Sequence, residues 1–117
     1  MNRDALQGIR VADFSWVWAG PLATLLLSFM GAEVIKIESR KRVDQMRQGS
    51  ITTGDSFSDF NASPIFNNAN LNKKGVTIDL SRPEGAELAK RIVAVSDVAI
   101  ENMRSGVMNK LGLGYKD

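Results

Sequence analysis

The chain has 117 residues, a length that allows one domain with a single modest core. Hydrophobic residues make up 44% of the sequence and charged residues 24%, as in an ordinary globular protein, so disorder is not the default expectation. The sequence contains no cysteine and no histidine, which excludes disulfides, thiolate chemistry and the usual zinc sites and fits a cytoplasmic setting. The net charge of +2 suits an anionic small molecule as well as nucleic acid.

A strand, a turn, a helix and a second strand are predicted in the first third of the chain. Residues 10–14 form a short strand candidate that ends at the turn SWVWAGP, residues 15–21. Pro21 suits the first turn of a helix, where the N–H that proline lacks would have no partner. Apolar residues then recur at helical spacing as far as Gly31, which is placed to end the helix. Residues 33–38 alternate polar and apolar, like a second strand parallel to the first.

The second half of the chain repeats this order after a long connection. Residues 39–72 lose the periodicity, and we expect a flexible loop there. A third strand is predicted at 76–80, and SRPE at 81–84 matches a capping box that opens a helix with one apolar face. A fourth strand at 98–100 and a short helix at 105–111 follow. This order predicts an α/β fold, a Rossmann-like doubly wound parallel sheet with flanking helices.

The carboxyl edge of such a sheet is the expected place for a ligand. It would gather the turn at 15–20, the chain from Ser39, the loop around Ser81 and residues 102–106. The free N–H groups where the first helix opens at Gly20 could face an anion or a thioester oxygen. The turn lacks the G-x-G-x-x-G pattern, so a nicotinamide enzyme is not expected.

Two basic clusters are candidate phosphate sites: Lys36 with residues 40–42, and the pair Lys73 and Lys74. Either cluster could equally be a solvated face. The first leaves a strand at the ligand edge, whereas the second enters its strand from the opposite direction and needs a loop folded back to join it. Nucleic-acid binding is disfavoured because no recognition motif accompanies the basic residues, and the apolar stretch after the first turn is too short to span a membrane.

Several motifs in the same order resemble the opening of the family III CoA transferases (the CaiB/BaiF family), and they cover nearly the whole chain. These motifs are LQGIRVADF (6–14), AGP (19–21), GAEVIKIE (31–38), Asp44 with Arg47, residues 70–74 with Asp79, and ENMRSGVMNKLGLG (101–114). The resemblance implies transfer of coenzyme A from an acyl-CoA to a carboxylic acid through covalent intermediates on an aspartate. It also implies an interlocked homodimer. The residues themselves give no reason to expect a metal, nucleic acid or a membrane as partner.

The resemblance carries coenzyme A contacts onto particular positions of this chain. Arg40 and the lysines would meet the adenosine phosphates, and Asn102 would hydrogen-bond the pantetheine amides. Trp18 stands where some oxalate-specific members have glutamine, so we expect a larger and more apolar acyl group. The positions implied as contacts are Val17, Trp18, Ala19, Arg40, Leu71, Asn72, Lys73, Lys74, Asn102, Met103, Lys110 and Leu111.

The resemblance places the catalytic aspartate beyond residue 117, so no catalytic residue is expected in this chain. We therefore expect residues 1–117 to be the N-terminal, CoA-binding part of a large domain, inactive alone. Two alternatives stay open. One is an α-methylacyl-CoA racemase of the same superfamily, whose acid–base residues would also follow this chain. The other is a truncated, non-catalytic CoA-binding or assembly fragment.

Overall fold

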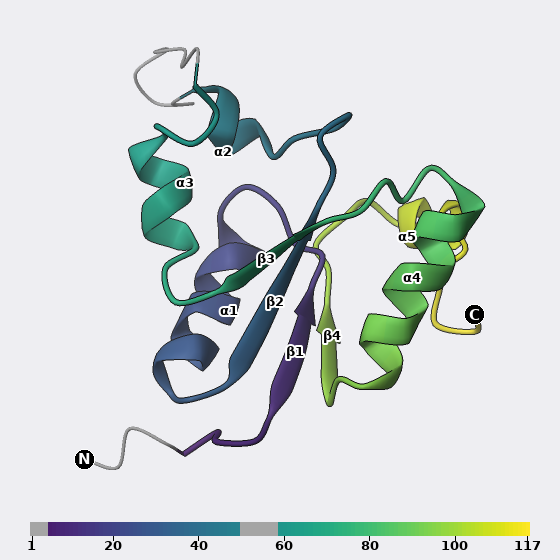
Figure 1. Ribbon diagram of the computed structural model, residues 1–117, viewed down its shortest axis with the longest axis horizontal. Helices are drawn as coiled ribbons and strands as arrows, with labels where there is room; N and C mark the ends of the chain where they lie inside the picture. The colour runs from purple at the N-terminus through teal and green to yellow at the C-terminus, as the bar shows by residue number, and fades with distance from the viewer. Residues whose placement is uncertain (1–4, 50–58) are drawn as a thin grey trace.

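The fold is built on a four-stranded parallel sheet, seen in a computed structural model that describes residues 5–49 and 59–117 (Figure 1). The strand order is β3-β2-β1-β4, and every pair is parallel. The strands are β1 (Arg10–Asp13), β2 (Glu33–Glu38), β3 (Lys74–Thr77) and β4 (Val98–Ile100). Their carboxyl ends therefore meet at one edge, and the predicted α/β fold is confirmed.

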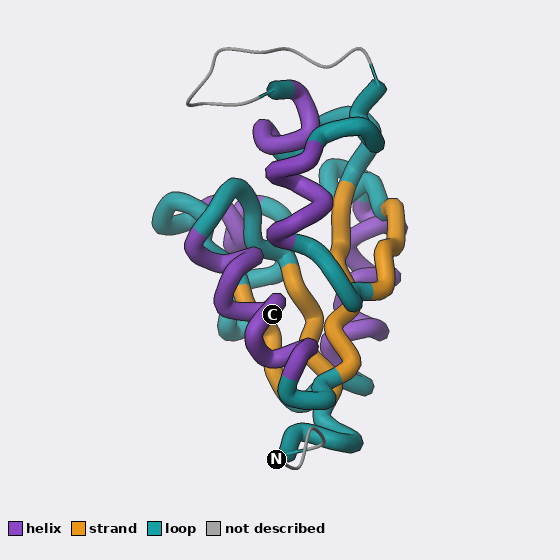
Figure 2. The backbone as a smooth tube through the Cα atoms, turned by 90° about the vertical axis from the view of Figure 1, so that its left-hand side faces the viewer, coloured by secondary structure: helices purple, strands orange, loops and turns teal. Residues whose placement is uncertain are grey.

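Helices cover both faces of the sheet (Figure 1). On one face lie α1 (Ala19–Phe29) and α3 (Pro64–Ala69), and on the other lie α4 (Pro83–Ala94) and α5 (Val107–Lys110). The short helix α2 (Gln45–Gln48) lies at the end of the molecule opposite the N-terminus (Figure 2). Because β1 starts near the N-terminus and all strands are parallel, α2 stands at the carboxyl edge.

The two faces of the sheet divide the core into two clusters because side chains alternate along each strand. Val11 and Val34 pack on the α1 side with Leu27. Ala12 and Ile37 point to the other side, where they pack with residues of α4 such as Ala89. The same alternation sends Asp13 and Lys36 toward the α1 side, where both are buried.

Two of the four strands have the predicted limits, and β3 is displaced. β2 and β4 begin and end as expected. β3 covers residues 74–77 instead of 76–80, because its pairing with β2 runs from Lys74 to Thr77 and ends where β2 ends. Ile78 still donates a hydrogen bond to the carbonyl of Glu38 at 2.7 Å before the chain turns away.

The predicted capping box at residues 81–84 is wrong. Arg82 is the residue before α4, and no side chain caps the helix. Ser81 lies one residue before the capping position, and its hydroxyl donates to the carboxylate of Asp79 at 2.6 Å.

Two short helices lie within the stretch that the sequence left without regular structure. Asp44 caps α2 by accepting from the N–H of Met46 at 3.0 Å. Ser63 caps α3 by accepting from the N–H of Phe66 at 3.3 Å, and Pro64 occupies the first helical turn. Helices of four and six residues are too short to give a helical period. The expected flexibility of residues 39–72 stays a prediction, and residues 50–58 of that loop lie outside the described part.

Several large apolar side chains are exposed on the surface. Leu26 and Phe29 lie on α1, Val95 follows α4, and Val98 is the first residue of the edge strand β4.

In the described ranges, 5–49 and 59–117, no helix has both the length and the apolar character that crossing a membrane requires.

Candidate functional site

The turn after β1 is held by side chains from other parts of the chain. Asn102, just beyond β4, binds both polar backbone groups of Trp16: its Oδ1 accepts from the Trp16 N–H and its Nδ2 donates to the Trp16 carbonyl, each at 2.8 Å. Ser15 is tied to Asp13, whose Oδ1 accepts from the Ser15 N–H at 2.9 Å. The ends of β1 and β4 are thereby fixed to one another at the carboxyl edge.

Buried charges from β2 and the following loop complete the turn. Lys36 Nζ donates to the carbonyl of Ser15 and lies 3.9 Å from the carboxylate of Asp44. Asp44 accepts from the N–H of Val17 through both oxygens, at 3.1 and 3.2 Å. The predicted basic cluster of Lys36 with residues 40–42 does not form, because the Lys36 side chain is buried and only 3% exposed.

The first turn of α1 opens beside this structure. Trp18 precedes the helix, and no side chain caps it. Within residues 5–49 and 59–117, the N–H groups of Trp18, Ala19 and Gly20 have no hydrogen-bond acceptor. Gly20 lets the helix approach the turn, since a Cβ there would lie 2.3 Å from Ser15 Cβ. The result is a group of free N–H donors at the positive end of a helix, as anions and polarised carbonyl oxygens require.

A buried ion pair lies beneath α1. Lys73 Nζ lies 3.2 Å from Asp13 Oδ2 and donates to the carbonyl of Pro21 at 2.9 Å and to Asn70 Oδ1 at 2.8 Å. Asp13 Oδ2 also accepts from the hydroxyl of Thr24 at 2.6 Å. Burial lowers the pKa of Lys73 below its usual value, and the charge of Asp13 opposes that effect. The Lys73 ammonium therefore faces the protein interior and an internal carboxylate.

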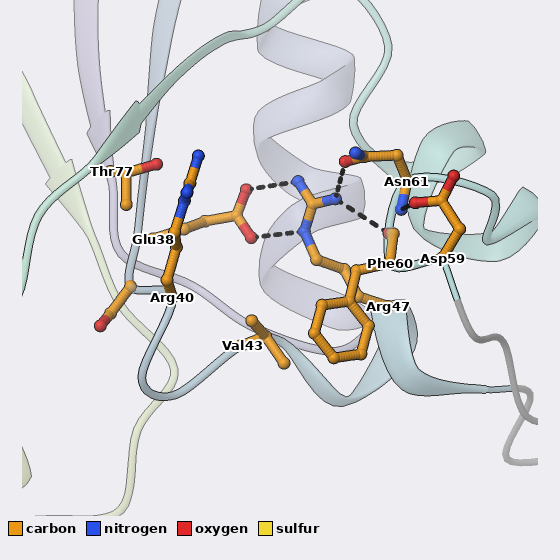
Figure 3. Close-up of a pocket in the computed structure, with 9 residues that line it drawn as sticks. Glu38, Arg40, Val43, Arg47, Asp59, Phe60, Asn61 and Thr77 are labelled. Carbon is orange, nitrogen blue, oxygen red and sulfur yellow. Dashed lines mark hydrogen bonds and ion pairs between the residues drawn. The ribbon is translucent and has the colours of Figure 1, made fainter.

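A pocket of about 450 Å³ lies beyond the end of β2, with Arg40 on one wall and Phe60 on the opposite wall (Figure 3). Arg47 also lines the pocket and pairs with both oxygens of Glu38 at 2.7 and 2.8 Å. The Arg47 guanidinium also lies over the ring of Phe66, 3.6 Å from its centroid. Arg40 is exposed and makes no ion pair in the described part of the chain. It is therefore the cation at this pocket that remains available to a ligand.

A second, more apolar pocket of about 280 Å³ lies between β2 and α5. Met103 and Leu111 line it together with Trp16. Lys41 at its rim lies 2.8 Å from a carboxylate oxygen of Asp79. That contact and the hydroxyl of Ser81 lower the pKa of Asp79 to about 2.

The structure gathers most of the implied contact positions at the carboxyl edge and leaves others away from it. Asn72 donates from Nδ2 to the carbonyl of Ser28 at 3.0 Å, near the far end of α1, and Leu71 contacts the same serine. Lys74 pairs with Glu33 at the start of β2, and this contact lowers the pKa of Glu33. Lys110 is the exposed last residue of α5. The positions at the carboxyl edge are Val17, Trp18, Ala19, Arg40, Asn102, Met103 and Leu111.

The buried support of the turn was not predicted from the sequence. From the sequence, Lys36 was assigned to a basic cluster and Asp44 to a motif with Arg47, and neither was expected to be buried. One signal was present: in residues 33–38, Lys36 occupies the same face as Val34, which alternation would bury. No cluster of three or more Asp, Glu, His or Cys residues that could hold a metal ion occurs among residues 5–49 and 59–117.

The family model of CoA-transferase family III matches residues 6–117. The chain therefore belongs to the CoA-transferase family III.

Named relatives and solved structures agree with this family. The human succinyl-CoA:glutarate CoA-transferase is 37% identical over 99% of this chain and 25% of its own length, and the formyl-CoA:oxalate CoA-transferase of Afipia carboxidovorans is 35% identical over 97% and 26%. The crystal structure of the hypothetical protein Rv3272 of Mycobacterium tuberculosis superposes with a TM-score of 0.80 at 38% identity, covering 96% of this chain and 29% of that one. The chain thus spans about a quarter of the length of the curated relatives it matches.

Proposed function

We propose that residues 1–117 contribute the coenzyme A binding surface of an acyl-CoA:carboxylate CoA-transferase. The observation that carries the proposal is the turn at 15–17, fixed by side chains of three other segments beside the uncapped N–H groups of α1. These donors can face the thioester carbonyl or an anionic group of the ligand without reorganising. Arg40, exposed at the neighbouring pocket, supplies a positive charge for the adenosine phosphates.

The positions away from the edge need a different role within this proposal. Leu71, Asn72 and Lys74 would contact coenzyme A only through a part of the ligand that extends past the end of the sheet. Lys73 would act indirectly, since its ammonium is bound to Asp13. Lys110 would approach the ligand from the end of α5, next to Leu111 at the carboxyl edge.

The acyl-CoA donor and the carboxylic acid acceptor are the substrates of the complete reaction that we propose. The curated relatives described above are named CoA-transferases, which favours acyl transfer over the racemase alternative. No residue of this chain is proposed as the nucleophile. The half-exposed indole of Trp18 beside the free N–H groups favours a bulky, apolar acyl group. An interlocked homodimer in the cytoplasm completes the proposal, and a non-catalytic CoA-binding fragment remains the alternative.

Coenzyme A titrations of two arginine variants test the binding surface. We expect Arg40→Ala to raise the Kd for coenzyme A about tenfold, because a charge-assisted hydrogen bond is lost. Arg91→Ala removes the same charge from the exposed side of α4 and should leave the Kd within about twofold. Isothermal titration calorimetry measures both, and dephospho-CoA shows whether Arg40 meets the 3′-phosphate. Equal Kd values for Arg40→Ala and the parent would remove Arg40 from the site.

A further inference from the structure

Val17 has a backbone conformation that its side chain disfavours. Its φ is 66°, in the left-handed region, where a β-branched residue is an outlier. The other non-glycine residue with positive φ among residues 5–49 and 59–117 is Asn72, a residue type that tolerates this region. Interactions with the surrounding structure must therefore hold Val17 in place.

The carboxylate of Asp44 makes the contact that holds Val17. Both of its oxygens accept from the Val17 N–H, and one also accepts from Met46 at the start of α2. The Asp44 side chain is fully buried, and the ammonium of Lys36 lies 3.9 Å away. A buried carboxylate with these partners has little freedom to move, so the position of the Val17 N–H is fixed as well.

The residues on both sides of Val17 are immobilised by other contacts. Trp16 is bound through its N–H and carbonyl to Asn102. On the other side, Gly20 packs closely against Ser15. The conformation of Val17 therefore sets the direction in which α1 leaves the turn, and with it the direction of the free N–H groups at the start of the helix.

We infer that Asp44 is a positioning residue: by holding Val17 in the left-handed conformation, it aims the N–H groups of residues 18–20 at the ligand. This inference rests on the proposed function, because it takes coenzyme A as the molecule that those N–H groups face. Asp44 does not itself touch the ligand. Its effect on binding passes through the backbone of Val17.

The first test reads the conformation without any ligand. Backbone chemical shifts of residue 17, which report the sign of φ, are compared between the full-chain parent and Asp44→Asn. We expect residue 17 to leave the left-handed region in Asp44→Asn. Asp97→Asn is the control, because the Asp97 carboxylate accepts the Arg10 N–H at the opposite edge of the sheet, and residue 17 should stay in the left-handed region there. If the lone charge of Lys36 unfolds Asp44→Asn, the double variant Lys36→Gln with Asp44→Asn serves instead. Unchanged shifts at residue 17 overturn the inference.

The second test measures coenzyme A binding by calorimetry in a cycle of Asp44→Asn and Val17→Gly. Glycine adopts positive φ freely, so it should restore the turn that Asp44→Asn releases. We expect Asp44→Asn alone to raise the Kd about tenfold and the double variant to return within about threefold of Val17→Gly. Rescue would also exclude a general loss of folding in Asp44→Asn, since glycine at position 17 would not repair it. A double variant that binds as weakly as Asp44→Asn overturns the positioning role.

The two tests separate failure of the inference from failure of the proposed function. A parent that binds no coenzyme A, together with a change at residue 17 in Asp44→Asn, overturns the proposed function while the contact between Asp44 and Val17 keeps its conformational role. A parent that binds coenzyme A, together with an unchanged residue 17 in Asp44→Asn, overturns the inference alone.

Discussion

Replacement of Lys73 by methionine should be among the most destabilising single changes in this chain. Its ammonium and the carboxylate of Asp13 are 1% and 0% exposed, so the variant leaves a buried carboxylate without its counter-charge. Breaking such a pair costs about 3–5 kcal/mol. Asp13 keeps donors from Ser15 and Thr24, which places the expected cost at about 3 kcal/mol, the lower end of that range. For a domain of this length, that corresponds to a fall in Tm of roughly 12 °C.

Removing both charges should recover most of the free energy of unfolding that Lys73→Met loses. In Lys73→Met with Asp13→Asn, the new amide can donate to the Thr24 hydroxyl, which in turn can donate to the carbonyl of Pro21, 3.1 Å away. Replacing a buried ion pair by neutral groups is often nearly neutral, so we expect this double variant within about 1 kcal/mol of the parent.

Urea unfolding followed by tryptophan fluorescence measures these free energies of unfolding. Lys74→Met is the matched control, because Lys74 pairs with Glu33 at the surface and its side chain is 72% exposed. That control should change the free energy of unfolding by no more than about 0.5 kcal/mol. The reasoning is refuted if Lys73→Met costs no more than Lys74→Met, or if the double variant is as unstable as Lys73→Met alone.

Two further predictions concern Asp79 and its neighbours. The folded state lowers the pKa of Asp79 from 3.8 to about 2, so its contribution to stability is present above pH 3.8 and is lost as the pH falls toward 2. Asp79→Asn should therefore flatten the pH dependence of the urea midpoint between pH 3.8 and 2. An unchanged slope would contradict the lowered pKa of Asp79. Gly85→Ala should cost at least about 2 kcal/mol, although alanine usually favours a helix, because its Cβ would lie 2.0 Å from the Asp79 carbonyl oxygen. Gly75→Ala, with no atom within 4 Å of the added Cβ, is the control, and equal urea midpoints for the two alanine variants would refute the clash.

The sequence predicted most of the fold because the relevant signals are local. Residues 33–38 alternate, and Gly31 has the positive φ expected after a helix. The limits of β3 were wrong because strand ends depend on the partner strand, and β2 has no further residue to pair after Glu38. The capping residue of α4 was wrong because the helix begins at Pro83, one residue later than a Ser81 cap requires. The N–H and hydroxyl of Ser81 instead both donate to Asp79 in a local turn, an alternative that the pattern does not exclude.

The candidate site was predicted only in part because its support is non-local. The positions of Trp18, Arg40 and Asn102 at one edge follow from the order of the strands. The ion pair between Asp13 and Lys73 joins segments 60 positions apart, and no spacing rule connects them. The left-handed conformation of Val17 was also invisible, because valine is a residue type that argues against it.

The ion pair between Asp13 and Lys73 has a consequence for synthesis on the ribosome. A nascent chain that has emerged only as far as α3 can form β1, α1 and β2, yet its Asp13 carboxylate still lacks the ammonium that neutralises it. Closing the intervening loop carries an entropic cost that must be met before this contact forms. We therefore expect the first protease-resistant intermediate to emerge only once the start of β3 has cleared the exit tunnel.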